Sequence, residues 1–209
     1  MEAALRRFNV EDINEGVDRI KEKYEDLVLK YHHTIPSRLV YARIDLESGG
    51  NPNAVARPQK WQTGHGSEMG LLMLSPDTRA QYNISKEEAV DPETNIRIGC
   101  KIWNAWVGRF FIETLGDPPL PVLDDVRGTW AWMVTAVGPG ATRRLRSLNK
   151  NSYDLENLIL LCSSEKVMTK NAKYWGSQDR RTVTWRVGTA IAIARICAQR
   201  MPFDVEEEQ

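Results

Sequence analysis

The sequence predicts an all-α fold. Apolar residues recur at helical spacing along most of the chain, no segment alternates apolar and polar residues as a strand does, and no repeat or low-complexity tract occurs. With 209 residues, of which 42% are hydrophobic and 27% charged, the chain is long enough to form one sizeable core. The formal net charge is zero, so charge gives no argument for a nucleic-acid partner or an anionic membrane surface.

Residues 11–31 are expected to form an amphipathic helix whose apolar face packs on the core or, alternatively, binds a partner. Starts with a Ser or Asp cap followed by Pro predict helices from Pro76 and from Pro92, the latter reaching about Thr114. Helical spacing predicts the remaining helices around Trp130–Val137 and at 141–148, 153–168 and 181–200. The last of these is apolar nearly all round and is expected to be buried.

For the domain organisation, we expect an N-terminal accessory helix at 1–34, a main domain at 35–200 that includes the C-terminal helices, and an acidic tail at 201–209. The N-terminus leads into a mixed acidic and basic helix without the apolar core of a signal peptide, so no export signal is expected. No window approaches the roughly 18 apolar residues of a membrane span.

Residues 36–53 contain the pattern on which the functional interpretation depends. Pro36 fits the first turn of a helix, where its missing N–H has no cost. Helical spacing of apolar residues starts at Leu39, and the helix is expected to end abruptly at Gly49 and Gly50.

Glu47 is the candidate catalytic residue. It lies on the same stripe as Val40 and Ile44, which is expected to face the core, whereas Asp45 lies roughly 160° around the helix and is expected to face solvent. Burial and the negative end of the helix dipole both disfavour a carboxylate anion. The sequence therefore predicts a carboxyl group that can serve as a general acid near neutral pH.

Four motifs follow one another along the chain. They are Glu-Ser-Gly-Gly-Asn-Pro-Asn-Ala-Val from Glu47, Gly-Leu-Leu-Met-Leu-Ser-Pro from Gly70, Asp-Pro-Glu-Thr-Asn-Ile-Arg-Ile-Gly from Asp91, and Gly-Pro-Gly-Ala from Gly138. Over about residues 35–146 the chain resembles the soluble lytic transglycosylase family, helical proteins related to goose-type lysozyme that cut the glycan strands of bacterial peptidoglycan. The resemblance implies a lysozyme-like helical domain, here with added N- and C-terminal helices.

The resemblance implies a reaction with one glutamate and no metal or organic cofactor. In such enzymes the glutamate protonates the β-1,4 glycosidic oxygen and then takes the proton of the muramic C6 hydroxyl, which closes a 1,6-anhydro ring. By this resemblance Glu47 is the catalytic residue, and the positions that contact substrate are Ser48, Met73 and Thr135. No second carboxylate is needed; if the protein were a hydrolytic muramidase, the candidates are Glu68 and Asp77.

Two motifs depart from the family pattern. Where the family has Gly-Leu-Met-Gln, this chain has Met73 in place of the glutamine. Where the family has Ala-Tyr-Asn-Ala-Gly-Pro, it has Thr135 and Ala136 in place of the tyrosine and the asparagine. A site that loses polar groups for substrate hydroxyls loses discrimination. An alternative is therefore a non-enzymatic phage virion, ejection or tail protein that keeps the domain as a scaffold.

Both alternatives fit a phage protein. Without an export signal, a peptidoglycan-cutting protein is expected in a phage virion, acting in the host periplasm or cell wall, with peptidoglycan strands and other virion proteins as partners. Alternatively, such a protein is delivered at lysis, or the chain has been trimmed of its leader.

Other candidate residues receive structural interpretations. Three cysteines lie in apolar helical runs without metal-binding spacing and are expected to be buried free thiols: Cys100, Cys162 and Cys197. The adjacent His32 and His33 are not expected to chelate a metal. Trp103 and Trp106 have the spacing of a core stripe, and the loop residues Trp61 and His65 either face substrate or pack on the surface. Arginines at 143, 144 and 146 either meet carboxylates or form a solvated face.

Overall fold

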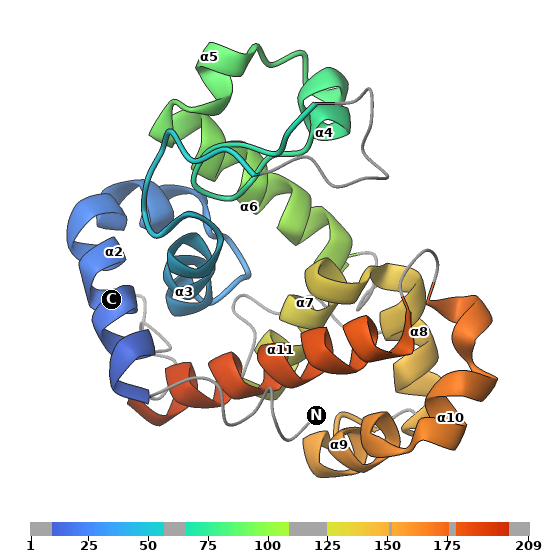
Figure 1. Ribbon diagram of the computed structural model, residues 1–209. Helices are drawn as coiled ribbons and strands as arrows, with labels where there is room; N and C mark the ends of the chain where they lie inside the picture. Colours follow the sequence, from blue (N-terminus) through green and yellow to red (C-terminus); the bar gives the residue numbers. More distant parts are fainter. Residues whose placement is uncertain (1–9, 57–65, 109–124, 151, 176–178, 201–209) are drawn as a thin grey trace.

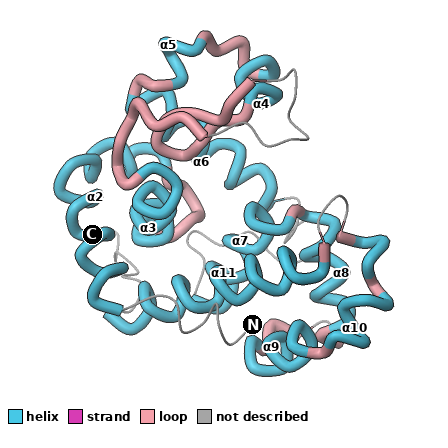
Figure 2. The backbone as a smooth tube through the Cα atoms, in the orientation of Figure 1, coloured by secondary structure: helices cyan, strands magenta, loops and turns pink. Residues whose placement is uncertain are grey.

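The structure of the protein is a computed structural model that describes residues 10–56, 66–108, 125–150, 152–175 and 179–200. The described residues contain helices and loops but no strand, and Figure 2 shows the loops that join the helices. The all-α prediction is confirmed. The helices are α2 (Val10–Tyr31), α3 (Ser37–Ser48), α4 (Pro76–Gln81), α5 (Lys86–Ala89), α6 (Pro92–Gly108), α7 (Asp125–Val137), α8 (Pro139–Leu148), α9 (Leu155–Ser163), α10 (Glu165–Lys170), the 3-10 helix η3 (Ala172–Tyr174) and α11 (Arg180–Arg200).

The helices form two groups on either side of α3 and α7. In Figure 1, α4, α5 and the loop before them lie together at one end of α6, whereas α8, α9 and α10 gather at the opposite side. The long helix α11 contacts α2, α3, α7 and α9, and in this view α9 lies below it. This arrangement places α3 in the middle of the fold, next to α2 and α11.

One hydrophobic cluster contains buried side chains from α2, α3, α6, α7, α8, α9, α10 and α11. The α3 side chains of Leu39, Val40 and Ile44 are fully buried in it. The apolar face of α2 is buried there as well, through Ile13, Val17, Ile20, Tyr24 and Val28. Packing, rather than partner binding, is therefore the role of that face. Because α2 shares the core, no break in packing marks a boundary at residue 34, and the division into 1–34, 35–200 and 201–209 stays a prediction.

The helix starts that the sequence predicted at Ser75-Pro76 and Asp91-Pro92 are confirmed. The Ser75 hydroxyl accepts a hydrogen bond from the Thr78 N–H at 3.1 Å, and the Asp91 carboxylate accepts one from the Thr94 N–H at 2.8 Å. Such side-chain acceptors satisfy backbone donors that have no partner within the helix. The buried helix expected at 181–200 is also confirmed, as α11.

Other boundaries differ from the prediction. The single helix expected at 153–168 is divided into α9 and α10, because the Ser164 hydroxyl accepts the Val167 N–H and begins a new helix. The helix predicted to reach Thr114 is described as far as Gly108, and residues 109–114 lie outside the described residues. Among the described helices, none has the length and apolar character that crossing a bilayer requires.

The arginines of α8 do not share one face. Arg146 is buried, with its guanidinium carbon 4.1 Å from the centre of the Tyr153 ring. Arg144 donates a hydrogen bond to the Asn171 side chain at 2.8 Å, and Arg143 is exposed. Neither a carboxylate-binding face nor a solvated face, the two interpretations made from the sequence, describes all three arginines. The reason is that α8 packs against α7 on one side and against η3 on another.

Candidate active site

Helix α3 ends at Ser48, and two glycines follow it. The Ser48 hydroxyl donates to the Ile44 carbonyl at 2.9 Å and accepts from the Gly50 N–H at 3.2 Å. Gly49 has φ +62° and donates its N–H to the Asp45 carbonyl at 2.8 Å. A left-handed residue just past a helix is a common helix stop, and glycine adopts it without strain. The Ser48 hydroxyl is thus bonded to the backbone, and its predicted contact with substrate stays a prediction.

Asp45 does not face solvent as the sequence predicted. Its side chain is 17% exposed and forms an ion pair with Arg19 of α2. It lies against Gly16, where a Cβ atom would collide with the Asp45 carboxylate. Helix α2 therefore covers the face of α3 that carries Asp45, and the missing side chain at Gly16 makes the room for it.

Glu47 lies at an exposed position instead of on the buried stripe. Val40 and Ile44 are fully buried as expected, but the Glu47 side chain is 40% exposed. The reason is that α3 ends at Ser48, so its last turn extends past the core that covers the turns before it. The expectation of a buried carboxyl is wrong. Its ion-pair partner is Arg43, one helical turn earlier, with 3.7 Å between Arg43 Nε and Glu47 Oε1.

The loop before α4 is shaped by one buried side chain of α6. The Asn95 amide accepts a hydrogen bond from the Leu72 N–H at 2.7 Å and donates to the carbonyls of Ala89 at 2.7 Å and Met69 at 3.2 Å. Within this loop Met69 and Leu74 form an isolated antiparallel bridge. All three bonds are buried or partly buried, so Asn95 fixes the position of the turn between Met69 and Leu74.

Two glycines let this turn approach α6 closely. Gly70 has φ +83°, and a Cβ there would collide with the Asn95 side chain. A Cβ at Gly99, one helical turn after Asn95, would lie 2.9 Å from the Leu72 Cβ. The motifs that begin at Gly70 and at Asp91 therefore pack closely against each other. Met73 follows in the turn with φ +49°, a backbone conformation that is uncommon for a non-glycine residue.

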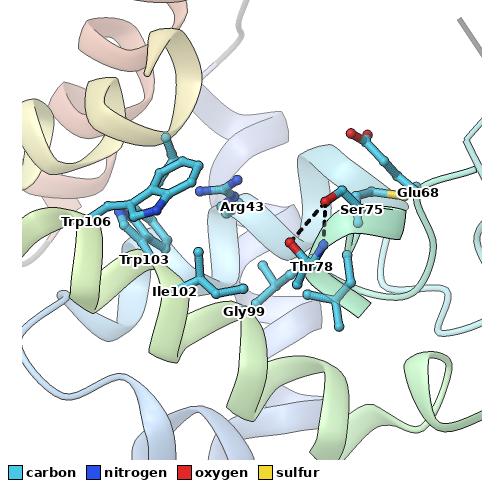
Figure 3. A pocket seen from close by; sticks show the side chains of 12 residues that line it. Arg43, Glu68, Ser75, Thr78, Gly99, Ile102, Trp103 and Trp106 are labelled. Atoms are coloured by element: carbon cyan, nitrogen blue, oxygen red, sulfur yellow. Dashed lines mark hydrogen bonds between the residues drawn. The ribbon is translucent and has the colours of Figure 1, made fainter. Parts of the chain in front are cut away.

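A cavity of about 200 Å³ lies between this turn, α3, α6 and α7. Figure 3 shows the Arg43 guanidinium between the rings of Trp103 and Trp106 on one side and the Ser75–Thr78 pair on the other. The lining residues are Arg43, Glu68, Leu72, Met73, Leu74, Ser75, Thr78, Gly99, Ile102, Trp103, Trp106 and Thr135.

The cavity brings together some of the predicted site residues and not others. Met73, Thr135 and Glu68 line it. Glu47 and Ser48 are not part of its wall; Glu47 is connected to it through Arg43, which lines it. Asp77 is exposed on α4 and is also absent from the lining. Of the two candidates for a second carboxylate, the cavity therefore selects Glu68.

Arg43 is a site residue that the sequence reasoning missed. Its guanidinium carbon lies 4.9 Å from the centre of the Trp103 ring, a cation–π contact. Burial lowers the pKa of this guanidinium, and the nearby Glu47, Cys100 and Glu68 oppose the effect. The spacing i, i+4 from Glu47 was a signal in the sequence that the two side chains share one face of the helix.

Trp103 and Trp106 were interpreted as core residues, and both line the cavity. Trp103 is 2% exposed and donates its indole N–H to the Ala131 carbonyl at 3.0 Å. Trp106 is 37% exposed. The core interpretation holds for Trp103, but Trp106 presents part of its ring to solvent beside the cavity. The two rings differ in exposure because of how they lie relative to α7 and to the turn between Met69 and Leu74, and both of these segments are far from the two tryptophans in the sequence.

The remaining candidates are either buried in the structure or lie outside the described residues. Cys100 and Cys162 are buried free thiols, as predicted, and burial raises the pKa of each to about 12. Trp61, His65 and the Cys197 side chain lie outside the described residues. Within the described ranges, no group of three or more His, Cys, Asp or Glu side chains is placed to bind a metal ion.

These features define a class of protein: an all-helical domain with an exposed glutamate at the end of a central helix, beside a small cleft lined by an arginine and tryptophans. Residues 28–115 match the family model described as Transglycosylase SLT domain. The matched segment contains α3, the turn between Met69 and Leu74, and α6, and it ends before Thr135 and the motif that begins at Gly138. The all-helical structure is consistent with the lysozyme-like fold of that family. The comparison with curated proteins gave no match.

Proposed function

We propose that the protein is a peptidoglycan lytic transglycosylase in which Glu47 acts as both acid and base. The observation that carries the proposal is the match of residues 28–115 to the Transglycosylase SLT domain, which implies a peptidoglycan substrate. Glu47 lies in the last turn of α3, is 40% exposed, and is at ion-pair distance from Arg43, which lines the cavity. The carboxyl is therefore accessible to a ligand, and Arg43 connects it to the cavity.

In this mechanism, protonated Glu47 donates its proton to the glycosidic oxygen as the bond breaks. The carboxylate then accepts the proton of the C6 hydroxyl, which attacks the anomeric carbon and closes the 1,6-anhydro ring. One carboxyl suffices, because the attacking hydroxyl belongs to the substrate and no water must be activated. General acid–base catalysis of this kind contributes about 100- to 10,000-fold in rate.

A second candidate is a virion scaffold without enzymatic activity, and two observations favour it. The Thr135 hydroxyl donates to the Trp132 carbonyl at 2.8 Å, so it does not donate to a ligand in this structure. Met73 brings a thioether to the cavity wall in place of an amide. The phage origin and the location in a virion stay predictions.

The experiment that separates these candidates is digestion of purified peptidoglycan followed by mass spectrometry of the released fragments. The proposal expects 1,6-anhydro ends with the unmodified protein and none with Glu47→Gln, whereas Glu68→Gln retains them. Fragments with free reducing ends that disappear in Glu68→Gln would instead indicate a hydrolase with two carboxylates. No fragments from a folded protein would contradict enzymatic activity and support the scaffold.

A further inference from the structure

Arg43 is the one cationic side chain among the described residues that line the cavity. Most other polar groups of the wall are occupied within the protein. The hydroxyls of Ser75 and Thr78 share a hydrogen bond of 3.0 Å, and the Thr135 hydroxyl donates to a backbone carbonyl. Among the side chains of the wall, Arg43 therefore carries the largest number of hydrogen-bond donors for a ligand.

The Arg43 guanidinium is fixed in place but makes no hydrogen bond to the described residues. It rests on the Trp103 ring, and its side chain is 19% exposed. The 3.7 Å between its Nε and Glu47 Oε1 is too long for a hydrogen bond. An arginine carries five N–H donors in a planar fork. Part of that fork is thus available to an acceptor from a ligand.

The ion pair with Glu47 does not explain why Arg43 lies in the cavity wall. Ion pairs at i, i+4 on a helix contribute little, and Glu47 is 40% exposed, so solvent screens the attraction. The contact with Trp103, in contrast, holds the guanidinium carbon 4.9 Å from the centre of the Trp103 ring, within the cavity wall. A preoriented fork loses less side-chain entropy per hydrogen bond when it binds a ligand.

We propose that Arg43 is a specificity-determining residue that binds an acyl oxygen carried by the sugar, in the cavity beside Glu47. The inference rests on the proposed function and adds the substrate group that this site recognises. Planar C=O and carboxylate oxygens match the guanidinium fork. In an amino-sugar strand such an oxygen belongs either to an N-acetyl carbonyl or to a lactyl carboxylate. Trp106, partly exposed on the same wall, offers a flat apolar surface to the adjoining ring.

Arg43 also offsets the two departures of the sequence from the family pattern. Met73 and Thr135, where the family has an amide and a phenol, line the same cavity as the guanidinium. The hydrogen-bond donors for the sugar therefore come from α3 instead of the turn and α7. A cavity of about 200 Å³ far exceeds the roughly 10–15 Å³ that one water needs, and it has room for an acyl substituent.

The experiment measures binding instead of cleavage. Tryptophan fluorescence and calorimetry are used with three tetrasaccharides: an N-acetylglucosamine oligomer, an alternating N-acetylglucosamine–N-acetylmuramic acid oligomer, and a glucose oligomer without acyl groups. Glu47→Gln serves as the background wherever turnover interferes. Removing a charge-assisted hydrogen bond in Arg43→Gln is expected to weaken binding of the acylated ligands by about 10- to 100-fold. Affinity for the glucose oligomer is expected to stay the same.

Two variants serve as controls. Arg43→Lys keeps the charge and most of the packing but loses the fork, and it is expected to give a smaller loss than Arg43→Gln. Arg97→Gln removes an exposed arginine from α6 that does not line the cavity, and it is expected to change nothing. A thermal melt of each variant shows whether it is folded.

The ligands distinguish the two sources of the acyl oxygen. Equal losses with both acylated oligomers indicate the N-acetyl carbonyl, and a loss confined to the muramic acid oligomer indicates the lactyl carboxylate. Unchanged affinity for every ligand in folded Arg43→Gln and Arg43→Lys overturns the inference, and it leaves the proposed function standing if anhydro products still form. Absence of binding of the acylated oligomers by the unmodified protein overturns the inference, and the proposed function falls as well only if digestion of peptidoglycan releases no anhydro fragments.

Discussion

The last turn of α3 carries two acidic residues that the fold treats differently. Asp45 faces α2, is largely covered, and pairs with Arg19. Glu47, two residues later, is 40% exposed and has Arg43, which lines the cavity, at ion-pair distance. The sequence predicted the reverse exposure for the two. The difference shows that the helix which packs on α3, rather than the spacing within α3, decides which carboxylate remains accessible for chemistry.

The largest expected effect separates the two carboxylates by activity. Glu47→Gln is expected to lower the rate of anhydro-fragment release by about 100- to 10,000-fold, because it removes the acid–base group. Asp45→Asn is expected to leave that rate unchanged and to lower the free energy of unfolding by up to about 1 kcal/mol, since the Arg19 pair is largely solvent-screened. Fragment release and urea unfolding of both variants measure this. An equal loss of activity in Asp45→Asn would contradict the distinction between the covered carboxylate of Asp45 and the exposed carboxylate of Glu47.

A second prediction tests the packing of α2 against the end of α3, through the two glycines that follow α3. Gly49 and Gly50 have φ +62° and +76°, so alanine at either position costs about 1–2 kcal/mol in backbone strain. A Cβ at Gly49 meets nothing within 4 Å, whereas at Gly50 it meets the Ile20 side chain. Overpacking typically costs about 1–3 kcal/mol. Gly50→Ala is therefore expected to be the more destabilising of the two by about that amount in urea unfolding.

The outcome depends on whether Ile20 can move. Equal destabilisation by the two alanines would mean that α2 shifts easily relative to the end of α3. In that case the burial of Asp45 would not depend on tight packing between α2 and α3.

A third prediction, with a smaller expected effect, concerns Ser48, the last residue of α3. Ser48→Ala removes a hydroxyl that bonds to the Ile44 carbonyl and the Gly50 N–H. The expected cost is about 0.5–1.5 kcal/mol in the free energy of unfolding, with no change in oligosaccharide affinity measured by calorimetry. A large loss of affinity without loss of stability would instead support the substrate contact predicted from the sequence.

The last prediction concerns the thiol of Cys100, near Arg43. Burial raises its pKa to about 12 from an ordinary value of 9.0. Because the folded protein retains this proton more tightly than the unfolded chain, the stabilisation is complete below pH 9 and is lost as the pH rises from 9 towards 12. Relative to Cys100→Ala, the unmodified protein is expected to lose stability over that range. A parallel pH dependence of the two would show that water reaches the thiol.

Some parts of the site were predictable because they depend on local chemistry. Ser75 and Asp91 cap their helices as short-range hydrogen bonding requires, and Gly49 ends α3 in the left-handed conformation. The motifs at Gly70 and Asp91 were identified, but their relation was not. Asn95 and Gly99 act on a turn more than 20 residues away, and nothing in local spacing shows that contact.

The sequence by itself determined the helical class, the stop of α3, the caps of α4 and α6, and the presence of Glu47 near the end of a buried helix. Local spacing suffices for these because helix propensity, capping and periodicity act over a few residues. Only the tertiary structure decided that Asp45 is covered by α2, that Arg43 joins the cavity wall, and that Trp106 is exposed beside it. These features depend on contacts between residues distant in the chain, whose burial is set by how the helices pack on one another.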